Sequence, residues 1–526
     1  MICFMISEDG VLQGLLAGGD GVEGAHQPLV RSPHGVRPHP PGIDRPFPGP
    51  GEFAEARVAT RASPVMVTYS DGVSRAPSRS SARLGKNLCD HETVHGDSAN
   101  RPVSSEHTRA PLAEHLRVLG PGLVTGASDD DPGGITTYSI AGAQLGYGML
   151  WTALATLPLM TAVQLTCARI GLVSGHGLAG AIRHHYPRPF LLIACALLVV
   201  ANVFNISADL GGMADVAEML TGIPSLAFVP ACGLTILVGT VYTSYATFAR
   251  TLKWLTVVLF AYVAAAFLAR PDWTQALRAS LVPTLTWDAS AVTTLVAILG
   301  TTIWPYLFFW QASQEVEEER AHGHRTLAQR RGATRPELRD ARLDVTVGMG
   351  FSNLVMYFII LATASTLHRT GLRDIESSRQ AAEALRPLAG DAAYLLFALG
   401  VLGTGLLTSP ILAGSASYAV AELFAWRSGL DLPPRRARRF YLVLTGAVVA
   451  GMALDLFDTN PIRMLFLSAV LNGLLAPPLL ALVMLAGNNR DIMGEHTNGF
   501  WLNLFGWLAT GIMTAAALAL VVTAAA

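Results

Sequence analysis

Residues 119–148 read LGPGLVTGASDDDPGGITTYSIAGAQLGYG, an apolar stretch interrupted by three adjacent aspartates, 129–131, and by a Pro-Gly-Gly triplet. Proline removes a backbone hydrogen-bond donor and clashes with the preceding helical turn. Glycine makes a helix easier to unwind because its backbone is conformationally free. The stretch therefore predicts a helix that is interrupted at residues 132–134.

The composition of the chain places this interrupted helix in a membrane. Of the 526 residues, 51% are hydrophobic and 14% are charged, whereas a typical soluble domain has roughly 25% charged residues. The mean hydropathy is +0.41, even though residues 1–115 are rich in Pro, Gly, Ser, Arg and His. We predict an all-α integral membrane protein preceded by a disordered extension over residues 1–115, because such a polar segment cannot bury enough apolar surface to fold.

Apolar stretches long enough to cross about 30 Å of hydrocarbon as helices recur from residue 118 onward. They are continuous rather than alternating, which argues against a membrane barrel. Lys and Arg number 18 in the loops after even-numbered stretches and 7 after odd-numbered ones, so we expect a cytoplasmic N-terminus and an external C-terminus. The eleven predicted spans are 118–142, 147–170, 189–211, 226–244, 252–269, 290–312, 345–367, 391–414, 439–456, 462–486 and 499–524.

The sixth span carries a second interruption. Residues 294–313 read TLVAILGTTIWPYLFFWQAS, in which Gly300 and Pro305 break the apolar run. Spans 1 and 6 are five apart and therefore run in opposite directions, as an inverted repeat of two five-helix halves requires. Such repeats bind substrate near the midplane, between the two breaks. An ordinary proline kink is the alternative for span 6.

The aspartates of span 1 need a compensating positive charge. A carboxylate within a membrane costs about 2.5–3.5 kcal/mol on insertion scales, and neither span 1 nor span 6 contains Lys or Arg. A metal cation, held by Asp131, Asp130 and carbonyl oxygens freed at the break, would supply that charge. A water-filled vestibule near Asp129 or Asp130 would lower this cost.

These stretches resemble the natural resistance-associated macrophage protein (Nramp) family of divalent-metal transporters over residues 116–520. The resemblance rests on GPGLVTGASDDDPGG (120–134), ARIGLVSGHGLAGAIRHHYP (168–187), ADLGGMADV (208–216) and ILGTTIWPYLFFWQAS (298–313). It implies the leucine-transporter-type inverted repeat with broken helices 1 and 6, working by alternating access.

The chain departs from the family pattern at several site positions. Asp131 matches the family's metal-binding Asp, but Gly134 replaces Asn and Trp304 replaces Met. Loss of a thioether removes a preference for soft metals, so we expect hard ions such as Mn²⁺ or Mg²⁺, with Fe²⁺ as a further candidate. The altered pattern resembles the Nramp-related magnesium transporter branch. The metal-site candidates are Asp130, Asp131, Gly134, Ile303, Trp304 and Asn472.

Proton coupling is not expected from these residues. Tyr306 and Gln311 stand where the family has histidines, and neither titrates near neutral pH. Uncoupled uptake is therefore the simpler hypothesis, and a proton pathway through Asp131 and Asp209 is the alternative. Asn472 lies in span 10, where the family has a Gln ligand; an interhelical hydrogen bond is the competing interpretation.

Other functions remain open at this point: an amino-acid or amine symporter on the same scaffold, or a membrane metal sensor without transport. No Walker-type loop or nucleophile-plus-base pattern suggests an enzyme. No cofactor is expected beyond the metal substrate, and the net charge of −1 gives no support for nucleic-acid binding. The expected partners are the metal cation, the lipid bilayer and, as a candidate, protons; the oligomeric state is open. Lysine occurs only at Lys86 and Lys253, which suggests a GC-rich bacterium and its inner membrane.

Overall fold

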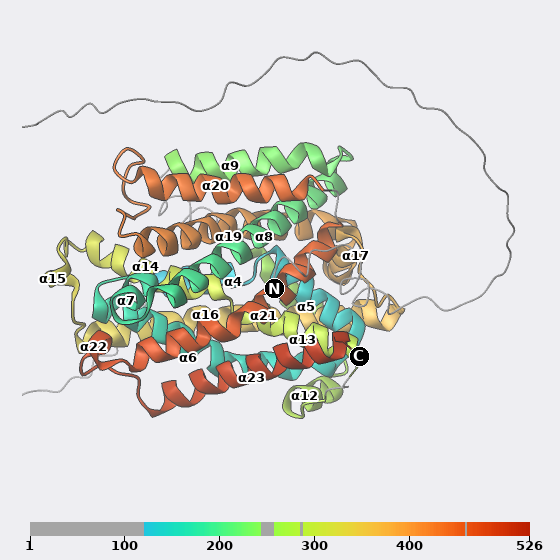
Figure 1. Cartoon of the computed structure of the whole chain (residues 1–526). Helices are drawn as coiled ribbons and strands as arrows, with labels where there is room; N and C mark the ends of the chain where they lie inside the picture. Colours follow the sequence, from blue (N-terminus) through green and yellow to red (C-terminus); the bar gives the residue numbers. More distant parts are fainter. Residues whose placement is uncertain (1–119, 243–256, 285–287, 458–459, 526) are drawn as a thin grey trace, which may run out of the picture. The chain divides into compact units, whose positions relative to one another are not determined.

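The computed structural model describes residues 120–242, 257–284, 288–457 and 460–525 (Figure 1). The extension predicted over residues 1–115 lies outside these described residues. Within them the secondary structure is helical, without strands, which confirms the all-α prediction. The helices are α4 Pro121–Asp129, α5 Pro132–Leu145, α6 Leu150–Ser174, α7 Leu178–His185, α8 Arg188–Thr221, α9 Phe228–Tyr242, α11 Phe260–Leu268, α12 Trp273–Leu281, α13 Ala289–Thr302, α14 Pro305–Ala321, α15 Leu327–Arg330, α16 Arg335–Thr363, α17 Ser378–Ala382, α18 Arg386–Ala389, α19 Ala393–Leu423, α20 Arg438–Asp455, α21 Pro461–Asn488, α22 Arg490–Met493 and α23 Phe500–Ala525.

Eight helical segments of the described residues are long and apolar enough to cross a membrane. Helices also occupy the described residues of the remaining predicted spans; residues 118–119 of span 1 and the part of span 5 before residue 257 lie outside the described residues. The count of eleven crossings and the inverted repeat stay predictions. Several connections contain short helices that the sequence pattern did not indicate, among them α7 and α12.

Both predicted interruptions are present, but each lies beside the predicted position. The first break falls at Asp130–Asp131, between α4 and α5, and Pro132 begins α5. The second falls at Ile303–Trp304, between α13 and α14, and Pro305 begins α14. Proline is favoured in the first turn of a helix, where its missing N–H has no partner to lose. The prediction that residues 132–134 and Gly300 are themselves unwound was therefore wrong, since all of them are helical.

The broken helices lie in the middle of the bundle (Figure 1). The long helix α8 packs against α19, α20 and α21, and α6 packs against α14, α16 and α23. Helix α16 packs along both α4 and α5, whereas α13 packs against α21. Each half of a broken helix is thus held by an unbroken neighbour, which fixes the position of the break.

The outer helices expose apolar side chains. In α23, Phe500, Trp501 and Val522 are each more than 60% exposed, and Leu234 in α9 is 61% exposed. A soluble protein rarely presents such continuous apolar surface. These faces are therefore suited to contact with lipid, as the composition predicts.

Candidate metal site

The first break is organised by Asp131. Its backbone is extended, and its side-chain Oδ1 accepts a hydrogen bond of 2.5 Å from the backbone N–H of Gly134. Asp131 thus caps the N-terminus of α5, where unpaired N–H groups favour a negative charge. Its second oxygen, Oδ2, is buried and has no hydrogen-bond donor among the described residues.

The other two aspartates of the triplet face α16. The hydroxyl group of Ser352 lies 2.6 Å from Oδ2 of Asp129 and 3.4 Å from Oδ1 of Asp130. All three carboxylates are fully buried, and none takes part in an ion pair within the described residues. Buried carboxylates without a cationic partner are costly. The described residues therefore do not supply the compensating positive charge that the sequence analysis called for.

Close contact between glycines brings α16 to the first break. A Cβ atom at Gly348 would lie only 2.1 Å from the carbonyl oxygen of Gly122, and one at Gly126 only 2.1 Å from the carbonyl oxygen of Gly348. Backbones can approach in this way only where side chains are absent. These glycines set the distance between Ser352 and the aspartates.

The second break contributes backbone groups and two large apolar side chains to the region, and no charged side chain. Ile303 and Trp304 form the connection, and both side chains are buried. In the described part of the chain, no side-chain hydrogen bond caps the N-terminus of α14. Gly300, which the sequence suggested as a helix breaker, instead permits contact with α21: a Cβ there would lie 2.1 Å from the carbonyl oxygen of Ala469.

The two breaks meet at one carbonyl group. The hydroxyl of Tyr306, one residue after Pro305, donates a 3.0 Å hydrogen bond to the carbonyl oxygen of Ser128. Thr408 of α19 donates to the same oxygen at 3.2 Å. Ser128 directly precedes Asp129, and Tyr306 directly follows Pro305. The aspartates of span 1 therefore lie beside the break of span 6.

Asp209 and Asn472 differ in their surroundings. Asp209 of α8 is 1% exposed, interacts electrostatically with Asp131, and has an Oδ2 atom without a donor in the described chain. Asn472 of α21 instead exchanges hydrogen bonds with Asn205 of α8, at 2.8 and 3.3 Å. The amide of Asn472 is thus engaged in the interhelical contact that was its alternative interpretation, so we leave it out of the proposed donor set.

Gly134 supplies a backbone N–H to Asp131 and no side-chain ligand. A Cβ at Gly134 would lie 3.2 Å from the carbonyl oxygen of Asp129 and 3.3 Å from Oδ1 of Asp131. A larger side chain would crowd these oxygens. The donors near the breaks are therefore carboxylate, carbonyl and hydroxyl oxygens, which suit hard cations.

The described side chains do not form a complete metal-coordination shell. Among the described residues, no three His, Cys, Asp or Glu side chains converge as metal ligands. The residues fit a site in which Asp131 and backbone oxygens hold an ion that retains part of its water, as Mg²⁺ usually does.

A cavity of about 380 Å³ lies at the N-terminus of α4. A buried chain of hydrogen bonds from Thr125 to Gln311 (2.6 Å) and from Gln311 to Glu315 (2.8 Å) connects it to the middle of α4. Glu315 is only 4% exposed, although it lies in a run of charged residues after the sixth predicted span. Acidic groups dominate the cavity lining, which includes Glu315, Glu318, Glu319, Glu337, Asp340 and Asp344.

Asp344 has a structural role in this conformation. Its carboxylate accepts hydrogen bonds from the backbone N–H groups of Gly120, Gly122 and Leu123, at 2.9, 2.6 and 3.0 Å. It therefore caps α4, which accounts for an acidic residue at this depth.

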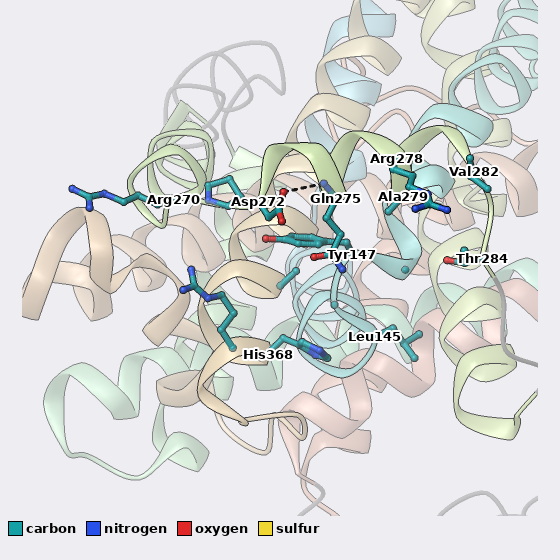
Figure 2. A pocket seen from close by; sticks show the side chains of 15 residues that line it. Leu145, Tyr147, Arg270, Asp272, Gln275, Arg278, Ala279, Val282, Thr284 and His368 are labelled. Carbon is teal, nitrogen blue, oxygen red and sulfur yellow. Dashed lines mark hydrogen bonds between the residues drawn. The ribbon is translucent and has the colours of Figure 1, made fainter.

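The cavity at the other end of α5 is basic. It has a volume of about 790 Å³ and is lined by Arg270, Arg278, Arg369 and His368. Asp272, the one acidic residue of its described lining, caps α12 by accepting a hydrogen bond from the backbone N–H of Gln275 (3.0 Å). Arg270 and Arg278 extend to different sides of it (Figure 2). The described residues of this cavity offer no oxygen cluster for a cation, so the break between α4 and α5 is the better candidate.

Sequence reasoning missed two residues near the breaks and did not place a third. Ser352 and Thr408 lie in helices without a distinguishing motif, and only the fold brings them to the aspartates and to Ser128. Tyr306 was noted as a replaced histidine, and its position directly after Pro305 was the one signal that could have placed it at the break.

Known proteins resemble this chain over most of its described length. The sequence pattern of the natural resistance-associated macrophage protein-like (Nramp) family matches residues 122–523. The divalent metal cation transporter MntH of Klebsiella pneumoniae (strain 342) is 28% identical over 427 residues, which cover 78% of this chain and 95% of the relative. MntH of Deinococcus radiodurans is 28% identical over 415 residues, covering 76% of this chain and 88% of the relative.

A solved structure shares the fold. The Eremococcus coleocola manganese transporter, in complex with an aromatic bis-isothiourea substituted compound, superimposes with a TM-score of 0.61 at 19% sequence identity. The match covers 79% of this chain and 88% of that one. With most of its helical region matched by the family pattern, this chain belongs to the Nramp family.

Proposed function

We propose that this protein is a secondary transporter that carries divalent metal cations across a bacterial inner membrane by alternating access. One observation carries the proposal: Asp131 lies fully buried at a helix break, beside a second break, with an oxygen that has no donor among the described residues. A cation is the partner that such a carboxylate lacks. The names of the MntH relatives support the same class of substrate.

The donor chemistry favours hard cations. Oxygen atoms surround the breaks, and Trp304, whose indole nitrogen offers no lone pair, stands in place of a thioether. We propose Mn²⁺ and Mg²⁺ as the preferred ions, with Fe²⁺ also accepted. Mn²⁺ agrees with the name of the structural relative from Eremococcus coleocola.

We propose that uptake follows the metal gradient without protons. Neither Tyr306 nor Gln311 exchanges a proton near neutral pH, and both are engaged in hydrogen bonds in this structure. The alternative route, from Asp131 to Asp209, would carry protons with the metal. Proteoliposomes containing a pH-sensitive dye distinguish the two: we expect Mn²⁺ entry without internal acidification, and metal-dependent acidification would establish coupling.

The loop charges support an orientation with the N-terminus in the cytoplasm and the C-terminus outside. The acidic cavity at the start of α4 would then face the cytoplasm, and the basic cavity at the end of α5 the exterior. Acidic walls attract cations, so we assign the acidic cavity to the inner path.

The decisive experiment is an uptake screen in proteoliposomes with Mg²⁺, Mn²⁺, Fe²⁺, Ca²⁺ and Cd²⁺, repeated with amino acids as competitors. We expect saturable Mn²⁺ or Mg²⁺ uptake that amino acids do not inhibit. Amino-acid uptake would instead identify a symporter, and cation binding without uptake would identify a sensor.

A further inference from the structure

The carbonyl oxygen of Ser128 is the point at which three helices meet. Ser128 is one residue from the end of α4, so its carbonyl lacks a partner within the helix. Two hydroxyl groups from other helices replace that partner: Tyr306 of α14 at 3.0 Å and Thr408 of α19 at 3.2 Å. A carbonyl oxygen has two lone pairs, and here both are occupied.

This occupancy conflicts with the binding of a cation. The carbonyl groups freed at the break are among the oxygens expected to hold the metal, and the carbonyl group of Ser128 lies three residues before Asp131. A cation can use that oxygen only if a hydroxyl group leaves it. The structure therefore contains a competitor for the ion within the site itself.

Tyr306 is the hydroxyl that lies next to the aspartates of the first break. The carbonyl oxygen that it contacts belongs to Ser128, which directly precedes Asp129. Asp129 and Asp131 each have one buried oxygen without a donor among the described residues. A phenol that turned from the carbonyl oxygen to one of these oxygens would remain hydrogen-bonded. The rest of Tyr306 is held in place, because Ser415 donates to its backbone oxygen at 2.7 Å and its ring packs on Trp304, 5.2 Å away between centroids.

We propose that the Tyr306 hydroxyl competes with the transported cation for the carbonyl oxygen of Ser128, and so lowers the affinity of the site. Without metal, the hydroxyl group joins α14 to α4 at that carbonyl. With metal, it moves to a carboxylate oxygen and releases the carbonyl to the ion. Weakened binding favours release, which a transporter requires at each cycle. This inference rests on the proposed transport of divalent cations.

The test measures Mn²⁺ binding to the purified full-length protein by isothermal titration calorimetry. Tyr306→Phe removes the hydroxyl group and keeps the aromatic ring. We expect its Kd for Mn²⁺ to fall about two- to tenfold, the range that one buried hydrogen bond supports. Uptake at saturating Mn²⁺ should slow, because release becomes harder. Thr408→Val, which frees the other lone pair, should lower Kd in the same direction.

Tyr441→Phe is the matched control. Tyr441 of α20 is also buried, and its hydroxyl group donates to the backbone oxygens of Leu430 and Leu432, at 3.1 and 3.0 Å. Its removal deletes the same kind of hydrogen bond away from the breaks and should leave Kd unchanged. An unchanged or higher Kd in Tyr306→Phe would overturn the competition. If the unsubstituted protein binds no divalent cation, the proposed function fails and this inference with it.

Discussion

The two helix breaks are alike in the backbone, since each is followed by a helix that begins with proline. They differ in the side chains that they bury. At the first, Asp129, Asp130 and Asp131 are buried together, and Asp131 caps the helix that follows. At the second, Ile303 and Trp304 are buried and the following helix has no side-chain cap. One break therefore supplies negative charge, and the other supplies backbone and shape. We therefore expect substitutions at the first break to change the affinity for the metal, and substitutions at the second break to change which metal is accepted.

The largest expected effect comes from the charge at the first break. Asp131→Asn keeps a side-chain oxygen for the Gly134 N–H and removes only the charge, whereas Asp131→Ala removes both. Loss of one partner from a buried charge pair costs about 3–5 kcal/mol, so Mn²⁺ binding should weaken at least ~100-fold in either variant. Uptake of ⁵⁴Mn²⁺ by proteoliposomes measures this loss.

Thermal unfolding separates the two roles of Asp131. Only Asp131→Ala should lower the unfolding temperature, because loss of an N-cap costs about 1 kcal/mol. Trp304→Phe, at the second break, should retain uptake. Uptake like that of the unsubstituted protein in Asp131→Asn would show that the charge does not bind the ion, and would end the contrast between the breaks.

The next effect concerns how the first break is held. Gly348→Ala places a methyl group where a Cβ would lie 2.1 Å from the carbonyl oxygen of Gly122. Overpacking of this kind costs about 1–3 kcal/mol or more, and it should push α16, with Ser352, away from the aspartates. We expect reduced thermal stability together with a loss of uptake.

Gly350→Ala is the control on the same helix, since a Cβ there has no neighbour within 4 Å. It should be neutral or slightly stabilising, because alanine is favoured over glycine in helices by about 0.5–1 kcal/mol. Equal behaviour of the two variants would mean that the close approach of α4 and α16 does not support the site.

A smaller effect should follow from the second break. Trp304→Met introduces a thioether, which prefers softer metals. Cd²⁺ should then inhibit Mn²⁺ uptake at about tenfold lower concentration, equivalent to about 1.4 kcal/mol. Trp304→Leu, similar in size and without sulfur, distinguishes ligand chemistry from the added space: if both variants admit Cd²⁺ equally, bulk alone selects the ion.

Local signals made the breaks predictable. Pro132, Pro305 and the adjacent aspartates are readable within one span, so the sequence predicted two interrupted helices and Asp131 as a site residue. The positions were displaced by one or two residues, because proline starts a helix as readily as it ends one. Glycines 133, 134 and 300 were taken as breakers, although close packing or capping accounts for them.

Long-range contacts were beyond the sequence. Tyr306 and Ser128 are 178 residues apart, and Asp344 caps α4 across 224 residues. A capping aspartate and a ligating one have the same local pattern, since both are acidic residues near a helix end. Only the packing of α16 against α4 distinguishes them, and that packing depends on glycines whose partners one sequence does not reveal.

The smallest effect on metal binding is expected in α21. Substitutions there test whether Asn472 is a metal ligand in addition to the groups at the two breaks. Asn472 and Asn205 exchange hydrogen bonds and are both 1% exposed. Removal of either amide takes a buried hydrogen-bond partner from the other, which costs about 1–3 kcal/mol. When Asn205 is removed, the amide of Asn472 keeps its 2.7 Å hydrogen bond to the carbonyl oxygen of Ser468. Both Asn472→Ala and Asn205→Ala should therefore destabilise the protein, Asn472→Ala the more, and the double variant should be little worse than Asn472→Ala, as a coupled pair requires. The Kd for Mn²⁺ should stay within about twofold in all three variants, because the substitutions alter the packing between α8 and α21.

A Kd that rises in Asn472→Ala and not in Asn205→Ala would instead make Asn472 a ligand. The metal would then be held by the carboxylates of the first break, by backbone oxygens of both breaks and by an amide oxygen of α21.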